Sequence, residues 1–162
     1  MNRELMFSNI NNAWCTPQSF FDELNKEFGF TLDPCATDIS AKCKKYFTAI
    51  DDGLKQNWGG HTVFVNPPYG RQIHRWVKKC YEESLKPKTT VVLLMPSRTD
   101  TRYFHDYILG KAEIRFIKGR LKFVNLDTDV GRENRVEEMT PAPFPSLLAI
   151  FKQPKKEKSN DE

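Results

Sequence analysis

Residues 63–70, Val-Phe-Val-Asn-Pro-Pro-Tyr-Gly, combine a buried strand with the turn that ends it. The continuous apolar run at 63–65 is typical of a strand covered on both faces, as in a parallel sheet. Two consecutive prolines cannot donate backbone hydrogen bonds to a sheet, so Pro67 and Pro68 are expected just beyond the carboxyl end of that strand. In an open α/β sheet, ligands bind at this edge. The stretch therefore predicts a fold class and the place of a functional site.

Helix and strand patterns alternate on both sides of this stretch. Upstream, Thr16-Pro17 is typical of a helix start, apolar residues then recur on one helical face, and Gly29 ends the pattern. Further elements are expected as a strand over 30–32, a helix over 73–85, a strand over 91–95 and a short helix over 101–109. This alternation predicts an α/β fold with parallel strands, whereas residues 36–52 show no clear pattern.

The last third of the chain has a different pattern. Strands are expected over 112–117, 120–124 and 147–151, and a polar segment is expected over 125–140. Helices here give way to hairpin-like pairing. The sheet is therefore predicted to be mainly parallel with an antiparallel C-terminal hairpin.

The 162 residues suffice for one compact domain, which we expect to span 14–152. Residues 1–13 are polar and rich in asparagine, and 153–162 have no apolar side chain to bury, so a flexible N-terminus and a disordered tail are expected. The chain has no apolar stretch of membrane-spanning length, and its first residues lack a secretory signal pattern. These features predict a soluble, cytoplasmic protein without membrane association.

Charge and cysteine content narrow the function less. A net charge of +4, from 25 basic and 21 acidic residues, suits a polyanionic partner but is shared by many proteins that bind none. The four cysteines form no CxxC pair, and the three histidines do not cluster with them at the spacing of metal ligands. We therefore expect reduced, mostly buried thiols and no metal site.

The residue types in Asn66-Pro67-Pro68-Tyr69 suit methyl transfer to an amino group. The amino nitrogen of adenine is a poor nucleophile because its lone pair is delocalised into the ring. The side-chain carbonyl of Asn66 and the backbone carbonyl of Pro67 can each accept a hydrogen bond from this amino group as the methyl group arrives. Tyr69 offers a ring on which a base turned out of the duplex can stack. Alone, the four residues could be no more than a strand-ending turn, so this interpretation depends on the flanking sequence.

Seven segments in chain order resemble the amino-group DNA methyltransferases, and more closely the small phage-type, Dam-like adenine-N6 methyltransferases. They are WCTPQSFFDEL, LDPCATD, YFTAIDDGL, VFVNPPYG, MPSRTDTRYFHDYI, IRFIKGRLKF and APFPSLLAIF. The resemblance implies a single-domain, Rossmann-like fold that uses S-adenosylmethionine as cofactor and DNA as substrate. It also implies the cytoplasm of a bacterial host cell as the location if a phage encodes the chain.

The same resemblance implies a set of cofactor-binding residues. These are Trp14, Thr16 and Pro17 as an N-terminal motif, Asp33 and Pro34 near the methionine or ribose end, and Asp52 with Leu54 at the cofactor's adenine. Asp51 is an alternative to Asp52, and Asp38 is the candidate for the ribose contact. The chain departs from the wider superfamily in one respect, because no Gly-x-Gly turn follows the first strand.

Basic side chains late in the chain are candidates for binding DNA. Arg98 and Arg102 follow an apolar strand, and Lys118 and Arg120 lie in a basic stretch interleaved with aromatic residues, so contacts to phosphate are expected. A capped helix start and a solvated strand face are the alternatives. The polar 125–140 segment is the candidate target-recognition insertion, with base contacts expected from Arg132, Asn134 and Arg135.

Two other functions are compatible with the sequence. Asn-Pro-Pro-Tyr chemistry also serves methyl transfer to an RNA adenine or a protein glutamine, although the segments beyond the motif favour DNA. The missing glycine turn leaves open a DNA-binding relative that has lost the cofactor. The intact Asn66 to Tyr69 motif argues against this second alternative.

Overall fold

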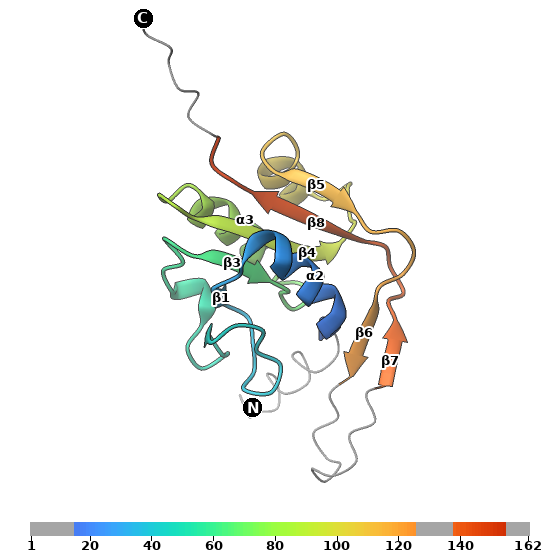
Figure 1. Cartoon of the computed structure of the whole chain (residues 1–162). Coiled ribbons are helices and arrows are strands. Elements are labelled where there is room, and N and C mark those ends of the chain that lie inside the picture. The colour runs from blue at the N-terminus through green and yellow to red at the C-terminus, as the bar shows by residue number, and fades with distance from the viewer. Residues whose placement is uncertain (1–14, 126–137, 155–162) are drawn as a thin grey trace, which may run out of the picture.

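A six-stranded sheet organises the part of the chain that this computed structural model describes, residues 15–125 and 138–154 (Figure 1). The strand order is β2-β1-β3-β4-β8-β5. Neighbours among the first four strands pair in parallel: β2 (Lys45–Tyr46), β1 (Leu32–Asp33), β3 (Thr62–Val65) and β4 (Thr90–Pro96). The last strand, β8 (Ser146–Phe151), lies antiparallel between β4 and β5 (Glu113–Phe116). The predicted mixed α/β fold with a mostly parallel sheet is thus confirmed.

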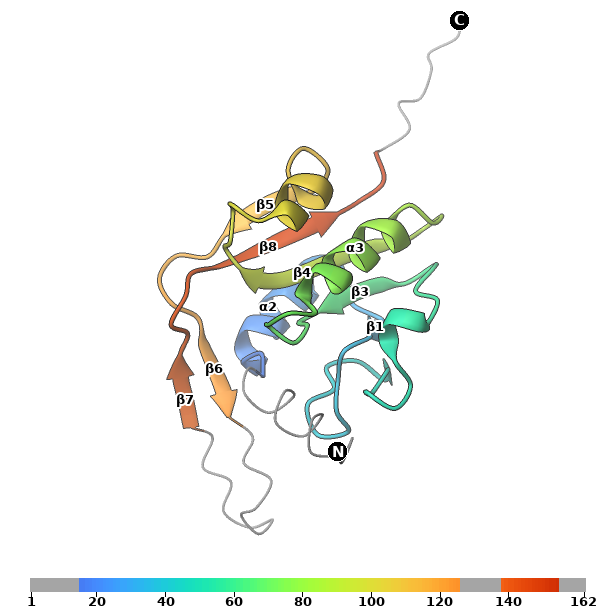
Figure 2. The same cartoon turned by 180° about the vertical axis from the view of Figure 1, so that it is seen from behind.

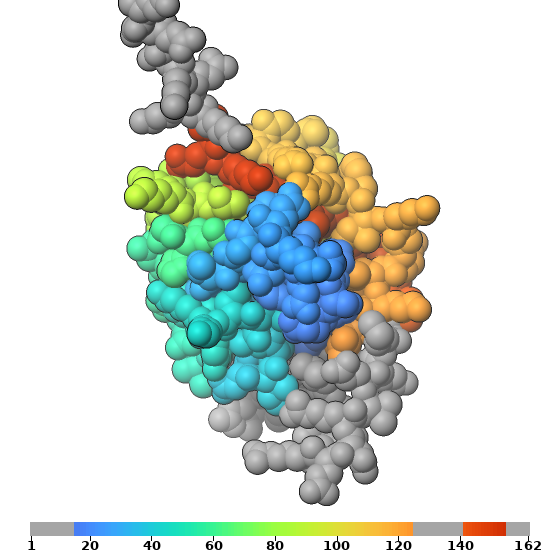
Figure 3. Space-filling model, in the orientation of Figure 1, coloured from blue at the N-terminus to red at the C-terminus, as the bar shows by residue number. Residues whose placement is uncertain are grey.

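The two longer helices, α2 (Gln18–Phe28) and α3 (Ile73–Ser84), cover opposite faces of the sheet (Figures 1 and 2). Side chains alternate along β4, so that Val92 and Leu94 pack with the α2 side while Leu93 packs with the α3 side. Each helix contributes its buried apolar face to one of the two resulting clusters. In the space-filling view, the segment around α2 lies across the middle of its face (Figure 3).

The start of α2 differs from the prediction. Pro17 stands at the N-cap position, no side chain caps the helix, and the Thr16 hydroxyl instead accepts a hydrogen bond from Asn66. The predicted end is confirmed, because Gly29 adopts a left-handed φ of 67° and its N–H donates to the Asn25 carbonyl.

The short elements agree only in part with the sequence prediction. The helix expected over 101–109 is present over 102–108, where η2 (Phe104–Ile108) is a π-helical turn. The region without a clear pattern, 36–52, contains β2, and the single turn η1 (Gly53–Lys55) follows it. Beyond β8, the Gln153 amide donates to the carbonyl of Leu85 at the end of α3, at 2.7 Å. The described fold therefore includes the first residue of the predicted tail, whereas 155–162 and 1–13 lie outside the described residues.

The antiparallel pairing expected near the C-terminus occurs in two places. Besides β8 in the main sheet, β6 (Lys122–Asn125) and β7 (Glu138–Pro141) form a separate two-stranded sheet. The segment predicted to be polar throughout therefore contains a strand, and its central residues, 126–137, lie outside the described part of the chain. A β-bridge joins β6 to the N-terminal segment, because Val124 N–H donates to the Cys15 carbonyl at 2.9 Å.

The parallel strands bring their carboxyl ends to one edge of the sheet. Asp33 ends β1, Asn66 follows β3 and Ser97 follows β4, so these three residues share that edge. No helix within the described residues is long and apolar enough to cross a membrane.

Candidate active site

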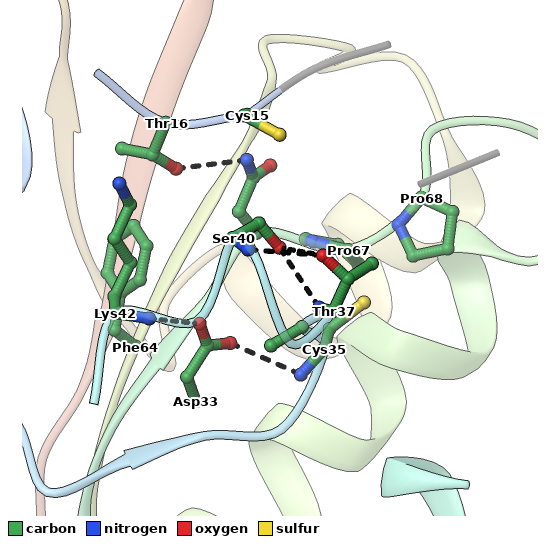
Figure 4. Close-up of a pocket in the computed structure, with 12 residues that line it drawn as sticks. Cys15, Thr16, Asp33, Cys35, Thr37, Ser40, Lys42, Phe64, Pro67 and Pro68 are labelled. Atoms are coloured by element: carbon green, nitrogen blue, oxygen red, sulfur yellow. Dashed lines mark hydrogen bonds between the residues drawn. The ribbon is translucent and has the colours of Figure 1, made fainter. Parts of the chain in front are cut away.

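Two adjoining cavities lie at this carboxyl edge. The polar cavity, of about 40 Å³, has polar and apolar atoms in its lining and includes Thr16, Asp33, Thr37, Ser40, Asn66 and Pro67 (Figure 4). The apolar cavity, of about 420 Å³, is lined mainly by apolar atoms and includes Pro34, Asp52, Gly53, Leu54, Tyr69 and Trp76. Cys35, Ala36 and Pro68 line both. The second volume is that of a typical small-molecule site.

The Asn66 amide is held at both ends. Its Nδ2 donates to the Thr16 hydroxyl at 3.0 Å, and its Oδ1 accepts from the Tyr69 hydroxyl at 2.7 Å. Pro67, the next residue, is buried and faces the same cavity. An oriented amide oxygen beside a backbone carbonyl is an arrangement that can accept two hydrogens from one amino group.

Tyr69 lines the apolar cavity, is half-buried and packs against two aromatic side chains. It meets Phe123 and Phe144 edge-on, with centroid separations of 6.2 Å and 5.5 Å. Burial raises the pKa of the Tyr69 hydroxyl, so this group stays neutral and donates. Besides Asn66, its hydroxyl reaches the Leu94 carbonyl at 3.4 Å.

Asp33 is a buried carboxylate that organises the loop after β1. One oxygen accepts from Cys35 N–H at 3.3 Å and the other from Lys42 N–H at 3.1 Å (Figure 4). Burial raises the pKa of the Asp33 carboxyl to about 6, while these two backbone hydrogen bonds oppose the shift. A positive charge placed nearby would lower the pKa of this carboxyl and favour its ionised form near neutral pH.

Side-chain hydrogen bonds stabilise this loop, which contains no glycine between Asp33 and Lys42. The Thr37 hydroxyl donates to Ser40 Oγ at 2.9 Å and accepts from Ser40 N–H at 3.1 Å, which closes a tight turn (Figure 4). Asp38 accepts from the Tyr46 hydroxyl at 2.8 Å and lines neither cavity. The structure therefore does not bring Asp38 to the site as the sequence predicted.

Close packing shapes the apolar cavity. A Cβ on Gly53 would lie 2.0 Å from the Pro34 carbonyl oxygen, so only glycine fits there without displacement. The Trp58 indole N–H donates to the Gly53 carbonyl at 2.9 Å and fixes the turn from the other side. Asp52 precedes it with a left-handed φ of 56°, and its carboxylate accepts from Leu54 N–H at 3.2 Å.

A buried ion pair supports this turn from α3. The Glu83 carboxylate accepts from Trp58 N–H at 3.0 Å and from the Lys79 ammonium at 2.7 Å. Although burial raises the pKa of Glu83, its hydrogen bonds outweigh that effect and hold the pKa below the ordinary value. The position of Gly53 therefore depends on Trp58 and Glu83, two residues outside the cavity lining.

Comparison with known proteins identifies the family of this site. The family model of the DNA N-6-adenine-methyltransferases (Dam) matches residues 6–159, nearly the whole chain. The chain belongs to the Dam family. The resemblance found in the sequence motifs is thus confirmed, and with it the reaction class, adenine methylation of DNA.

Two phage relatives carry the family name in full. A DNA N-6-adenine-methyltransferase of Haemophilus phage HP1 is 29% identical over 143 residues, which cover 86% of this chain and 78% of the relative. One of Escherichia phage T1 is also 29% identical, over 114 residues that cover 69% of this chain and 47% of the relative.

In this Dam-family chain, the structure brings together most of the predicted catalytic and cofactor-binding residues. Those that line the two cavities are Thr16, Asp33, Pro34, Asp52, Leu54, Asn66, Pro67, Pro68 and Tyr69. Asp51 is tied to Thr48 N–H at 2.9 Å and lines neither cavity, so Asp52 is the better placed of the two carboxylates. Pro17 starts α2 without lining a cavity, and Trp14 lies outside the described residues.

The predicted DNA-contacting residues are less concentrated. Arg98, Arg102, Lys118 and Arg120 are exposed. Arg98 and Lys118 come just after the ends of β4 and β5, the two strands that flank β8. Both strand ends lie beside the beginning of β8, since Ser97 N–H donates to the Pro145 carbonyl and Ile117 N–H donates to the Ser146 carbonyl. Arg115 differs from these four, since it forms a two-pronged ion pair with Glu27 at 2.7 Å. Arg132, Asn134 and Arg135 lie outside the described residues.

The Dam-family site also includes residues that the sequence interpretation did not select. Arg71, Gln72, Arg75 and Trp76 line the apolar cavity from the beginning of α3. Their place directly after the Asn-Pro-Pro-Tyr turn could have indicated this, since a helix that follows such a strand starts at the carboxyl edge. Among the described residues, no group of histidine, cysteine or acidic side chains could hold a metal ion.

Proposed function

We propose that the chain transfers a methyl group from S-adenosylmethionine to the N6 amino group of an adenine turned out of DNA, with Asn66 at the reacting atoms. The observation that carries this proposal is the Asn66 amide in the polar cavity, hydrogen-bonded to Thr16 and to Tyr69. Membership of the Dam family supports the same reaction.

The chemistry assigned to the polar cavity is hydrogen-bond acceptance. Asn66 Oδ1 and the Pro67 carbonyl each accept one hydrogen bond from the adenine amino group, which concentrates electron density on its nitrogen. An amide oxygen has two lone pairs and can therefore keep the Tyr69 hydroxyl while it accepts from the base. No side chain in this scheme removes a proton before transfer.

The two cavities suit the cofactor in both size and charge. The cofactor supplies an electrophilic methyl group on a sulfonium centre. The apolar cavity of about 420 Å³, with Asp52 and Leu54 at its lining, is assigned to the adenosine part. The buried Asp33 carboxylate in the adjoining polar cavity suits the positively charged methionine part. In this assignment, Pro68, which lines both cavities, lies where the two parts of the cofactor meet.

We also assign the wider architecture and the DNA contacts. The mostly parallel sheet with helices on both faces supports a Rossmann-like methyltransferase class, with one catalytic domain over 14–152. Exposed Arg98, Arg102, Lys118 and Arg120 are assigned to DNA phosphates, and the 125–140 segment with Arg132 and Arg135 to target recognition.

The reaction is tested by incubating the full chain with unmethylated duplex DNA and S-adenosylmethionine labelled in the methyl group, followed by nucleoside analysis. The proposal predicts label in N6-methyl-2′-deoxyadenosine and none when a duplex of only guanine and cytosine is used. Cofactor binding measured by calorimetry in the same preparation is the control. Bound cofactor without label in DNA, or label in a cytosine nucleoside, would contradict the proposal.

A further inference from the structure

We infer that the Thr16 hydroxyl is a positioning residue that fixes which end of the Asn66 amide faces the target amino group. This inference rests on the proposed function, because it explains how Asn66 is kept ready for that reaction. Thr16 is 4% exposed and lies fifty positions before Asn66, yet its Oγ accepts from Asn66 Nδ2 at 3.0 Å.

The chemistry of an amide makes its orientation decisive. The oxygen and nitrogen ends of an asparagine side chain are nearly equal in size, so rotation by 180° costs little steric energy. Only the oxygen accepts hydrogens, whereas the NH₂ end would place two donors against the donors of an adenine amino group. A site that binds an amino group therefore needs a feature that selects one orientation of Asn66.

The hydrogen bonds at the two ends of the Asn66 amide are not equivalent in this selection. The Tyr69 hydroxyl, which donates to Oδ1 at 2.7 Å, lies on the same turn as Asn66, three residues away. The Thr16 hydroxyl comes from a different segment and occupies the NH₂ end at 3.0 Å. With the NH₂ end at Thr16, Oδ1 lies at the Tyr69 hydroxyl and is the end that we assign to the target amino group.

The backbone around Thr16 restricts its movement. On one side, the Cys15 carbonyl accepts from Val124 N–H at 2.9 Å. On the other side, the Pro17 carbonyl accepts from Phe21 N–H at 3.1 Å in the first turn of α2. A hydroxyl fixed between a β-bridge and a helix start can hold the amide in one orientation without large motion.

A cofactor contact is the other role that Thr16 could have, since the sequence places it in a cofactor motif. The two roles differ in what they control. A cofactor contact sets the dissociation constant of S-adenosylmethionine, whereas a positioning contact sets the rate of transfer once the cofactor is bound. Thr16→Val removes the hydroxyl and keeps the side-chain shape, and Thr16→Ser keeps the hydroxyl.

The experiment compares Thr16→Val, Thr16→Ser and the wild type by single-turnover methyl transfer to DNA at saturating cofactor, with cofactor affinity measured by calorimetry. We expect the Thr16→Val rate to fall about 10- to 100-fold while its cofactor affinity stays within about threefold, because misplacement of a reacting group affects the rate step. Thr16→Ser should recover most of the rate.

Thr89→Val is the matched control. Thr89 is also buried, at 2% exposure, but its hydroxyl accepts from Gly60 N–H and donates to the Pro87 carbonyl, outside both cavities. It should keep the wild-type transfer rate. Thermal unfolding of each variant checks the fold, and Thr16→Ala, judged by the same criteria, replaces Thr16→Val if the latter does not fold.

Two results would overturn the positioning role alone: an unchanged Thr16→Val rate, or a weaker cofactor affinity with a normal rate at saturation. Failure of Thr16→Ser to recover the rate would also contradict it. A wild-type protein that binds the cofactor but methylates no DNA would instead overturn the proposed function, and this inference with it.

Discussion

The two cavities at the carboxyl edge are built by different means. In the polar cavity, hydrogen bonds orient polar side chains: Asn66 between Thr16 and Tyr69, and Asp33 between two backbone N–H groups. In the apolar cavity, close packing sets the shape, because Gly53 lies against the Pro34 carbonyl with no room for a Cβ. The polar cavity therefore fixes the orientation of its side chains, and the apolar cavity fixes the volume that is open to a ligand.

This difference has a consequence for the reaction. Catalysis depends on interactions that are stronger in the transition state than in the ground state, and oriented acceptors in the polar cavity can provide them. A shaped apolar volume binds the same cofactor portion before and during transfer. Changes at Asn66 in the polar cavity should therefore lower the transfer rate, whereas changes that disturb the apolar cavity or the charge of Asp33 should lower cofactor affinity.

The largest expected effect is that of Asn66→Ala. Loss of the oriented oxygen should lower the single-turnover rate by about 10²- to 10³-fold, while cofactor affinity stays near that of the wild type. Rapid-quench kinetics at saturating cofactor and calorimetry measure the two quantities. A large loss of affinity with a normal rate would remove the distinction between the cavities.

Gly53→Ala should have the opposite pattern. The added Cβ would meet the Pro34 carbonyl oxygen at 2.0 Å and Trp76 Cη2 at 3.2 Å, so the turn must move. Overpacking of this kind should weaken cofactor binding by about 10- to 100-fold, with a nearly normal rate at saturation. Gly110→Ala is the control, because it strains a left-handed φ of 75° in open space and should lower stability without changing affinity.

The pKa of Asp33 predicts a pH dependence in the polar cavity. Burial places this pKa at about 6, above its ordinary value of 3.8, so the ionised form that attracts a cationic ligand is lost as the pH falls through 6. Cofactor affinity should be about tenfold weaker at pH 5 than at pH 7. Calorimetry across this range tests it, and a flat profile would exclude an electrostatic role.

The same shift affects the stability of the free protein with the opposite sign. Because folding favours neutral Asp33, its contribution to the free energy of unfolding is greatest below pH 3.8 and is lost as the pH rises through about 6. Denaturant titrations of wild type and Asp33→Asn isolate this contribution. The difference between them should vary with pH only across that window.

The smallest effect is expected for Tyr69→Phe. It removes the hydroxyl that donates to Asn66 Oδ1 but keeps the ring against Phe123 and Phe144, so the rate should fall about two- to tenfold. Tyr69→Ala also removes the ring and should lower activity on DNA more. Equal losses in the two variants, measured by the same single-turnover assay, would show that the hydroxyl provides the whole contribution.

The main helices and strands were predictable because the sequence of each one alone carries its pattern of apolar residues. The apolar runs of β3 and β4 and the amphipathic pattern of α3 are visible in sequence, as is the turn that carries Asn66 and Tyr69. By contrast, β2 (Lys45–Tyr46) is two residues long and has no period to detect. β7 forms by pairing with β6, within a segment whose composition indicated only polarity.

The unpredicted parts of the site depend on contacts between distant segments. Thr16 has the sequence of a helix cap, yet its hydroxyl bonds to Asn66 fifty residues away. Asp38 was expected at the ribose, but its carboxylate accepts a hydrogen bond from the Tyr46 hydroxyl and lines neither cavity. The requirement for glycine at position 53 follows from its approach to the Pro34 carbonyl, which exists only after the chain folds.

The central claim is that the Asn66 oxygen accepts a hydrogen bond from the target amino group. Its neighbours in the polar cavity hold it in place for that contact. A crystal structure with S-adenosylhomocysteine and adenine-containing DNA tests it most directly. The predicted result is one exocyclic N6 with both Asn66 Oδ1 and the Pro67 carbonyl at hydrogen-bond distance, about 2.7–3.2 Å. A target base bound outside the polar cavity, or an Asn66 amide with its Nδ2 facing that nitrogen, would contradict it.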